Sequence, residues 1–233
     1  MATYRPLAEI LRPSELSEFI GQRHLLDPDK PIGKALADNQ LHSMILWGPS
    51  GVGKTTLARI ICSQMGAHFE QMSAVLDGIK ELRNVIEHAQ LYEHQDKNTI
   101  LFVDEIHRFN KAQQDAFLPH IESGLITLIG ATTENPSFEI NSSLLSRSRV
   151  YILDKLSSED LSTIASKALK NQDILLDDDG SLALIVNSSD GDARRLINII
   201  EQLTETSNKT LNRDVIAKTL QEKVSSFDKG GDI

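Results

Sequence analysis

The sequence predicts an α/β fold: a parallel sheet of buried strands with flanking helices, followed by a small all-helical domain. Three observations support this fold class: short continuous apolar runs, amphipathic helical stretches between them, and the absence of strand-like runs after Leu153. Strands buried on both faces of a parallel sheet are typically continuous apolar runs, whereas half-exposed strands alternate. The length of 233 residues suits one or two such domains.

The strand candidates are short apolar runs, each bounded by polar or turn residues. Four are clear, at residues 44–47, 100–103, 125–129 and 150–153, and a weaker fifth lies at residues 68–72. Their lengths are ordinary for strands, and they do not alternate strictly. The sequence therefore predicts a five-stranded parallel sheet.

Between these runs, apolar residues recur at the spacing of one face of a helix. Two apolar faces stand out, formed by Leu57, Ile60, Ile61 and Met65 and by Ile79, Leu82, Val85, Ile86 and Ala89. Asn110 followed by Gln113 predicts a capping box at a helix start. We expect Pro119 to kink or end that helix.

After residue 153 the pattern is helical throughout. Helices are expected from Ser157, after Asp179, from about Asp192 and from near Asn212. We therefore expect an α/β domain at residues 1–154, a helical domain at residues 155–222 and a polar tail at residues 223–233.

The composition narrows the classes of protein. No apolar run approaches the roughly 18 residues of a membrane-spanning helix, and the N-terminus does not resemble a secretory signal. A single cysteine, Cys62, excludes an internal disulfide framework and a cysteine-built zinc site. With a net charge of −9 and 5% aromatic residues, the chain is not expected to carry a broadly basic or stacking surface for nucleic acid, although a local basic groove stays open. These features predict a cytoplasmic protein with no membrane partner.

A phosphate-binding loop is the strongest motif in the sequence. The G-x-x-x-x-G-K-[ST] pattern lies between a predicted strand and a predicted helix. The residues expected to bind nucleotide there are Gly48, Pro49, Ser50, Gly51, Val52, Gly53, Lys54, Thr55 and Thr56. Lys54 would reach the β and γ oxygens and the Thr55 hydroxyl would ligate Mg²⁺, while the glycines turn backbone N–H groups toward the phosphates. The expected cofactors are ATP and Mg²⁺.

Two adjacent carboxylates follow the run at residues 100–103. At that strand end Asp104 would orient the Mg²⁺ ligands, and Glu105 would polarise the water that attacks the γ-phosphate. An Asp-Glu pair favours hydrolysis over transfer to a small acceptor. His107 extends the run to Asp-Glu-Ile-His, but a helicase of that class needs a second sheet domain, and the residues after 153 are too few and too helical.

Further polar residues follow the later strands. Asn135, or alternatively Thr132 or Thr133, would hold the attacking water or contact the γ-phosphate. Arg147 is a candidate arginine finger that projects into the ATP site of a neighbouring subunit, with Arg149 as the alternative. Arg194, at the start of the third predicted helix of the helical domain, would fold back over the γ-phosphate.

Taken together, these motifs resemble the AAA+ ATPases of the clamp-loader and Holliday-junction-helicase branch, and most closely the replication-associated recombination protein A (RarA/MgsA) family. The resemblance covers essentially the whole chain. The diagnostic stretches are Arg12-Pro13, residues 18–22, 41–48, 104–115 and 130–139, and Gly191 to Arg195.

The resemblance assigns roles to these residues. Lys54 and the Asp104-Glu105 pair become the Walker A and Walker B groups, Asn135 sensor 1, Arg147 the finger and Arg194 sensor 2. The adenine pocket falls within residues 1–42 and would be lined by Arg12, Pro13, Phe19 and Ile20. It further implies DNA with a fork or single-stranded end as partner, single-strand-binding protein as a possible one, and a location at the nucleoid.

The sequence departs from the family in two ways. Ser50 and Val52 stand where the family usually has Pro and Thr, both at variable loop positions, so nucleotide binding should survive. Residues 227–232 resemble the family's junction into a C-terminal oligomerisation domain. The chain is therefore expected to be a truncated form, a homo-oligomer at full length and a monomer as it stands.

Alternative functions stay open at this stage. The first is a Mg²⁺-dependent ATPase that remodels DNA or proteins at stalled replication forks, or a clamp-loader-like or Holliday-junction-motor-like subunit. The second is a nucleotide-gated binding module with negligible turnover. The third, a small-molecule kinase, would need an acceptor pocket that residues 156–220 do not suggest.

Overall fold

The structure is a computed structural model that describes residues 4–205 and 210–228, and it divides into two compact units. The α/β unit is Pro13–Asp154, and the helical unit combines Lys155–Ile233 with the segment up to Arg12. We expected the first twelve residues in the α/β domain. The described residues 4–12 belong to the helical unit, because Leu7, 2% exposed, is part of its apolar core.

A five-stranded parallel sheet forms the centre of the α/β unit, in the order β2-β3-β4-β1-β5. The strands are β1 (Met44–Trp47), β2 (His68–Ser73), β3 (Thr99–Asp104), β4 (Ile126–Thr132) and β5 (Arg149–Ile152). All five predicted strands are confirmed, with small shifts at their ends. Because β1 and β3 both pair with β4, the end of β4 lies between the ends of the other two.

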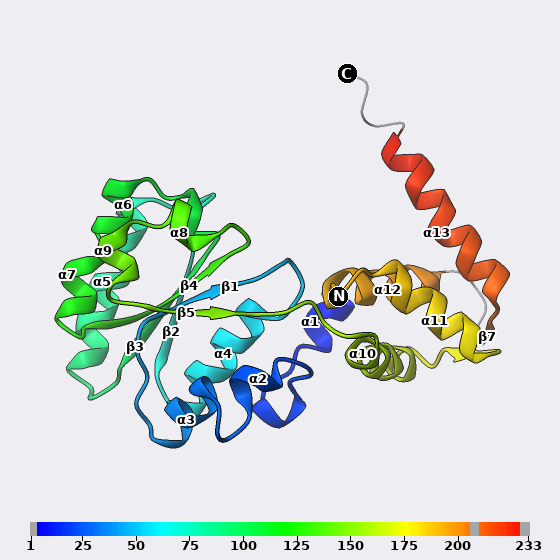
Figure 1. The fold of residues 1–233 in the computed structure, drawn as a ribbon, viewed down its shortest axis with the longest axis horizontal. Coiled ribbons are helices and arrows are strands. Elements are labelled where there is room, and N and C mark those ends of the chain that lie inside the picture. The colour runs from blue at the N-terminus through cyan, green and yellow to red at the C-terminus, as the bar shows by residue number, and fades with distance from the viewer. Residues whose placement is uncertain (1–3, 206–209, 229–233) are drawn as a thin grey trace. The chain divides into compact units, whose positions relative to one another are not determined.

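Helices cover both faces of this sheet, which Figure 1 shows as layers above and below the strands. Alternation along β3 explains the layers, since Leu101 and Val103 join one core and Ile100 and Phe102 the other. The first core is closed by α5 (Ile79–Glu93), α7 (Leu118–Glu122) and α9 (Ser142–Leu145). The second is closed by α2 (Arg23–Leu26), α3 (Pro31–Ala37) and α4 (Lys54–Gln64).

The predicted capping box starts α6 (Lys111–Asp115). The Asn110 side chain accepts a hydrogen bond from the Gln113 backbone N–H at 3.0 Å, and the Gln113 side chain accepts one from the Asn110 N–H. The helix ends before Pro119, which lies in the first turn of α7. Proline is tolerated there because a first-turn N–H has no partner within the helix. The remaining short elements of the unit are η1 (Leu16–Glu18), η2 (Ile106–Arg108) and α8 (Pro136–Glu139).

The helical unit is built from four longer helices, α10 (Ser158–Asn171), α11 (Asp179–Ser188), α12 (Ala193–Glu205) and α13 (Arg213–Asp228). Ser157 caps α10 as predicted, since its hydroxyl accepts from the Asp160 N–H at 3.1 Å. The sequence analysis missed α1 (Leu7–Ile10) and the two-residue strands β6 (Leu175–Leu176) and β7 (Thr210–Leu211). Such short elements carry no periodic signal.

The expected polar tail at residues 223–233 is only partly described. Helix α13 continues through Asp228, so the first part of that segment is helical, and residues 229–233 lie outside the described residues. Within the described ranges, no helix has both the length and the apolar character needed to span a membrane.

Candidate active site

The phosphate-binding loop connects β1 to α4 at the carboxyl end of the sheet. Gly51 and Gly53 have φ values of 66° and 99°, in the left-handed region that side chains rarely adopt. The second of these turns directs the chain into α4, which starts at Lys54. The motif predicted from sequence thus lies between the strand and the helix that its chemistry requires.

Lys54 is held by the loop itself. Its Nζ donates to the carbonyl oxygens of Gly48 and Pro49, both at 2.7 Å, and the residue is only 8% exposed. A buried ammonium group is costly unless its protons meet acceptors. The loop therefore keeps a positive charge in place beside the N-terminal turn of α4, where anions are favoured.

Val52 anchors the loop to the core. It is 1% exposed and belongs to the apolar cluster under α2, α3 and α4, whereas Ser50 is exposed. The two departures from the family pattern thus differ in kind. One side chain packs in the interior, and the other lies on the outside of the turn.

The segment expected to form part of the adenine pocket lies against this loop. An added Cβ on Gly53 would stand 2.7 Å from the Phe19 ring, so the ring packs directly on that glycine. Gln22, 6% exposed, ties the segment to the end of β5 through the backbone N–H and carbonyl of Asp154, at 3.0 and 2.8 Å. Pro13 and Ile20 belong to the same unit and are half-buried.

The acidic pair ends β3 as predicted. Asp104 is the last residue of the strand, and Glu105 has a φ of 52°, which turns the chain out of the sheet. Asp104 and the Thr55 hydroxyl offer the hard oxygen ligands that suit Mg²⁺. Among the described residues, no three His, Cys, Asp or Glu side chains gather as a metal site, so a cation here would take its other ligands from phosphate and water. The donor set fits Mg²⁺ bound together with a nucleotide.

Two groups contact Glu105, one just after the end of β4 and one in η2. The Thr133 hydroxyl lies 3.5 Å from Glu105 Oε2, and His107 Nδ1 lies 3.2 Å from the same oxygen. His107 Nδ1 is also 2.9 Å from the Thr132 hydroxyl. The Asn135 amide oxygen caps α8 by accepting from the Ser137 N–H at 3.0 Å.

The two candidate finger arginines differ in their surroundings. The Arg147 guanidinium pairs with Glu122 and donates to the Ser143 carbonyl at 2.9 Å. Within the described part of the chain, the Arg149 side chain makes no hydrogen bond or ion pair, and it is exposed at the start of β5. Burial, and then the charge of Arg149, lower the pKa of His42 below its usual range.

The remaining predicted residues belong to the helical unit. Arg12 pairs with Glu9 at 2.6 Å within its own N-terminal segment. Arg194 is exposed in the first turn of α12, whose start is capped by Asp192 through the Arg195 N–H at 2.9 Å. The sequence placed Arg194 at a helix start, and the structure agrees on that local position.

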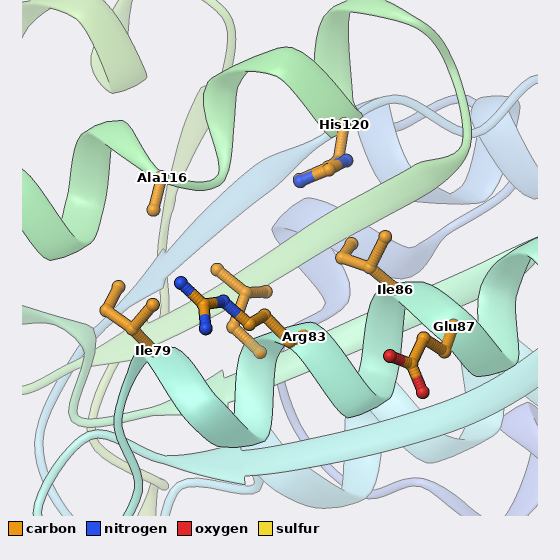
Figure 2. A pocket seen from close by; sticks show the side chains of 7 residues that line it. Ile79, Arg83, Ile86, Glu87, Ala116 and His120 are labelled. Carbon is orange, nitrogen blue, oxygen red and sulfur yellow. The ribbon is translucent and has the colours of Figure 1, made fainter.

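One pocket on the α/β unit is lined by none of the residues predicted for the nucleotide site. It has a volume of about 320 Å³ and lies between α5 and the α6–α7 segment (Figure 2). Its lining is formed by Ile79, Leu82, Arg83, Ile86, Glu87, Ala116 and His120. Burial lowers the pKa of His120 below its usual range.

The sequence contains no local signal for the contacts of His107. In the sequence it stands only in a helicase-like run, yet its side chain is 7% exposed and contacts both Glu105 and Thr132. The second contact joins residues far apart in the chain, so no local spacing could have signalled it. A strand-pairing prediction that placed β4 beside β3 would have brought these residues together.

Comparison with known proteins agrees with the geometry. A family model described as "Holliday junction DNA helicase RuvB P-loop domain" matches residues 11–144, and one described as "AAA C-terminal domain" matches residues 170–233. Among solved structures, the fold is similar to the Thermotoga maritima RuvB Holliday junction branch migration motor. That similarity has a TM-score of 0.74 at 30% identity and covers 91% of this chain and 72% of the other.

Curated relatives are more similar in sequence. Replication-associated recombination protein A of Escherichia coli is 48% identical over 245 residues, covering 99% of this chain and 54% of the relative. The protein of the same name from Coxiella burnetii is 51% identical over 241 residues, with 97% and 54% covered. The chain spans about half the length of the curated relatives it matches.

Proposed function

The chain belongs to the AAA+ ATPases of the replication-associated recombination protein A (RarA/MgsA) family, and we propose that it binds ATP with Mg²⁺ and hydrolyses it at the carboxyl edge of its sheet. The observation that carries the proposal is that two groups occur at this edge. Lys54 is hydrogen-bonded to its own phosphate loop, and the Glu105 carboxylate contacts His107 and Thr133 beside the neighbouring strand ends. We assign nucleotide binding to the lysine and hydrolysis to the carboxylate.

Nucleotide binding depends on an exchange of partners at Lys54. Its Nζ leaves the carbonyl oxygens of Gly48 and Pro49 for the β and γ phosphate oxygens, which are stronger acceptors because they are charged. The backbone N–H groups after the loop glycines and the N-terminus of α4 attract the same charge. Phe19, packed on Gly53, supports a wall for the adenine base.

Hydrolysis depends on Glu105 as general base. Its carboxylate would accept a proton from the water that attacks the γ-phosphate. Bound Mg²⁺ supplies charge neutralisation on the phosphates, and Thr55 and Asp104 are the residues that would hold it. Thr133, 3.5 Å from the base, is a better sensor candidate than Asn135, whose amide oxygen caps α8.

The arginine roles are further parts of the proposal. Arg149 is the better finger, since its guanidinium lacks a partner among the described residues while Arg147 is tied to Glu122. The assignment of Arg194 as second sensor and of Arg12 to the adenine pocket rests on the family resemblance alone.

The biological task follows from the name of the relatives. We infer that ATP hydrolysis drives remodelling of DNA or of DNA-bound proteins in replication-associated recombination, with forked or single-strand-ended DNA as partner and a homo-oligomer as the working form. Single-strand-binding protein as a partner and a cytoplasmic, nucleoid-associated location stay predictions. A clamp-loader-like or branch-migration subunit is the alternative within the same class.

A second candidate function is a nucleotide-gated binding module. It is favoured by the state of Lys54, which must give up two carbonyl partners before it contacts phosphate, so that occupancy alone changes the loop. Steady-state phosphate release by the full chain, with and without forked and single-strand-ended DNA, separates the two functions. Turnover of ATP supports the hydrolase, whereas tight Mg²⁺-dependent binding with no release of phosphate supports the module.

A further inference from the structure

His107 is a buried histidine beside the acidic pair that the proposed reaction has not used. It lies in η2, directly after the turn at Glu105, and its side chain is 7% exposed. Its Nδ1 is 3.2 Å from Glu105 Oε2 and 2.9 Å from the Thr132 hydroxyl. One ring nitrogen therefore stands between the carboxylate at the end of β3 and the hydroxyl at the end of β4.

The hydrogen-bond partners decide which atom carries the proton. The Thr132 hydroxyl accepts from the Glu134 N–H at 3.0 Å and can donate to the Glu134 carbonyl at 3.2 Å. With that donation made, the hydroxyl has only acceptor capacity left for His107. An unprotonated Nδ1 would also direct its lone pair at a carboxylate oxygen. With Nδ1 protonated, its one hydrogen is shared between the Thr132 hydroxyl at 2.9 Å and the Glu105 carboxylate at 3.2 Å.

The conformation of Glu105 makes such a donor useful. A φ of 52° turns the chain away from the strand, and the side chain stays 33% exposed. A long carboxylate in that position has many rotamers, and a general base must stand in one of them to act on a bound water. Two groups lie close to that oxygen, the Thr133 hydroxyl at 3.5 Å and His107 Nδ1 at 3.2 Å.

We propose that His107 is a positioning residue, whose Nδ1–H holds the Glu105 carboxylate toward the end of β4 and thereby links the base to the Thr132–Thr133 segment. The proposal rests on the proposed function, since it assigns Glu105 as the base. His107 does not touch the substrate. It acts only by fixing the carboxylate, so its loss should lower turnover without weakening nucleotide binding.

The experiment compares variants of the full chain in kcat and KM for ATP with Mg²⁺, together with the Kd for a fluorescent ATP analogue. His107→Ala and His107→Leu remove the donor, and His107→Asn keeps an N–H near the position of Nδ1. His120→Ala is the matched control, because His120 is also partly buried but lies in the separate pocket between α5 and α7 (Figure 2).

We expect His107→Ala and His107→Leu to lower kcat about 30-fold, as expected when a catalytic group is misplaced, with KM and Kd within about twofold of wild type. His107→Asn should recover kcat to within about threefold, and His120→Ala should leave it unchanged. Thr132→Val, which leaves the donor to Glu105 in place, should lower kcat by only about threefold.

Three results would overturn the inference. They are a kcat within twofold of wild type in His107→Ala, an Asn variant as impaired as the Ala variant, or a loss of binding that parallels the loss of kcat. Failure of the proposed function has a different signature, because wild type itself would then bind ATP without releasing phosphate, and both proposals would fall together.

Discussion

The phosphate loop and the base at Glu105 lie at the same edge of the sheet but are held in opposite ways. The loop is closed by contacts between near neighbours, since Lys54 donates to carbonyls five and six residues away. Glu105 contacts the Thr133 hydroxyl, 28 residues away, and His107, which is itself hydrogen-bonded to Thr132, 25 residues further along the chain. If these residues act as proposed, binding depends on local geometry and hydrolysis on the pairing of β3 with β4, so mutation should separate the two.

The largest effect is expected where the local contacts are broken. Lys54→Ala removes the ammonium group, which we propose exchanges the loop carbonyl oxygens for phosphate oxygens when ATP binds. Two charge-assisted hydrogen bonds are worth about 3 kcal/mol together, so the Kd for ATP should rise at least about 100-fold. Fluorescence titration measures it, with exposed Lys97→Ala as control. A Kd within threefold of wild type would contradict the proposed role of the loop in ATP binding.

The next effect tests the other half of the comparison. Glu105→Gln keeps the size of the side chain but not its basicity, so kcat should fall by about 100-fold or more while the Kd for ATP stays within about threefold. Phosphate release and nucleotide titration on the same preparation check both values. Glu93→Gln, at the exposed end of α5, is the control. Equal losses in binding and turnover would mean that the two regions do not act separately.

A smaller effect distinguishes the two sensor candidates. Thr133→Val should lower kcat about tenfold with little change in stability, because the hydroxyl faces the base from the end of β4. Asn135→Ala removes the cap of α8 and should cost about 1 kcal/mol of unfolding free energy, with kcat within about threefold. ATP turnover gives kcat for both variants, and chemical denaturation gives their free energies of unfolding. The reverse pattern would return the sensor role to Asn135.

Two glycines with positive φ test how the phosphate loop is held locally. Gly53 and Gly66 both have positive φ, 99° and 59°, but only Gly53 has a neighbour, the Phe19 ring, where a Cβ would stand. Each alanine substitution should lower the free energy of unfolding by about 1 kcal/mol, because alanine disfavours the left-handed backbone conformation. Gly53→Ala should in addition raise the Kd for ATP about fivefold, since the ring must move. Similar affinities for the two variants would contradict a role of Phe19 at the nucleotide.

The smallest expected change concerns Cys62, on α4 behind the loop. Burial raises the pKa of its thiol to about 11, and the residue is 3% exposed. Only the thiolate reacts, and at pH 8 it is about 0.1% of the population. Labelling by a thiol reagent should therefore be slow, and equally slow with or without nucleotide. Fast labelling of the nucleotide-free chain would show that α4 is not formed before binding.

Much of the fold was predictable because its signals are local. The five buried strands are continuous apolar runs, and the capping box at Asn110 needs only one residue three positions later. The phosphate loop is likewise a single stretch, from Gly48 to Thr55, with its glycines at the turns. Short-range physics determines each of these features, so the sequence contains the information in adjacent positions.

The parts that were missed depend on contacts across the fold. Nothing near His107 shows that Thr132 will lie beside it, because β4 pairs with β3 only in the folded sheet. Leu7 likewise gives no sign that its partners lie after residue 155. The choice among Asn135, Thr132 and Thr133 as sensor has the same origin, since it depends on which side chain lies near Glu105 in the fold and not on spacing along the chain.

Whether binding and hydrolysis use separate groups can be read from the nucleotide that remains on Glu105→Gln. The variant is incubated with ATP and Mg²⁺ for several wild-type turnover times, passed through a desalting column, and its bound nucleotide is separated by chromatography. We expect intact ATP on the variant and ADP on wild type, because the loop binds nucleotide without the proposed base. ADP on the variant in the same proportion as on wild type would contradict it.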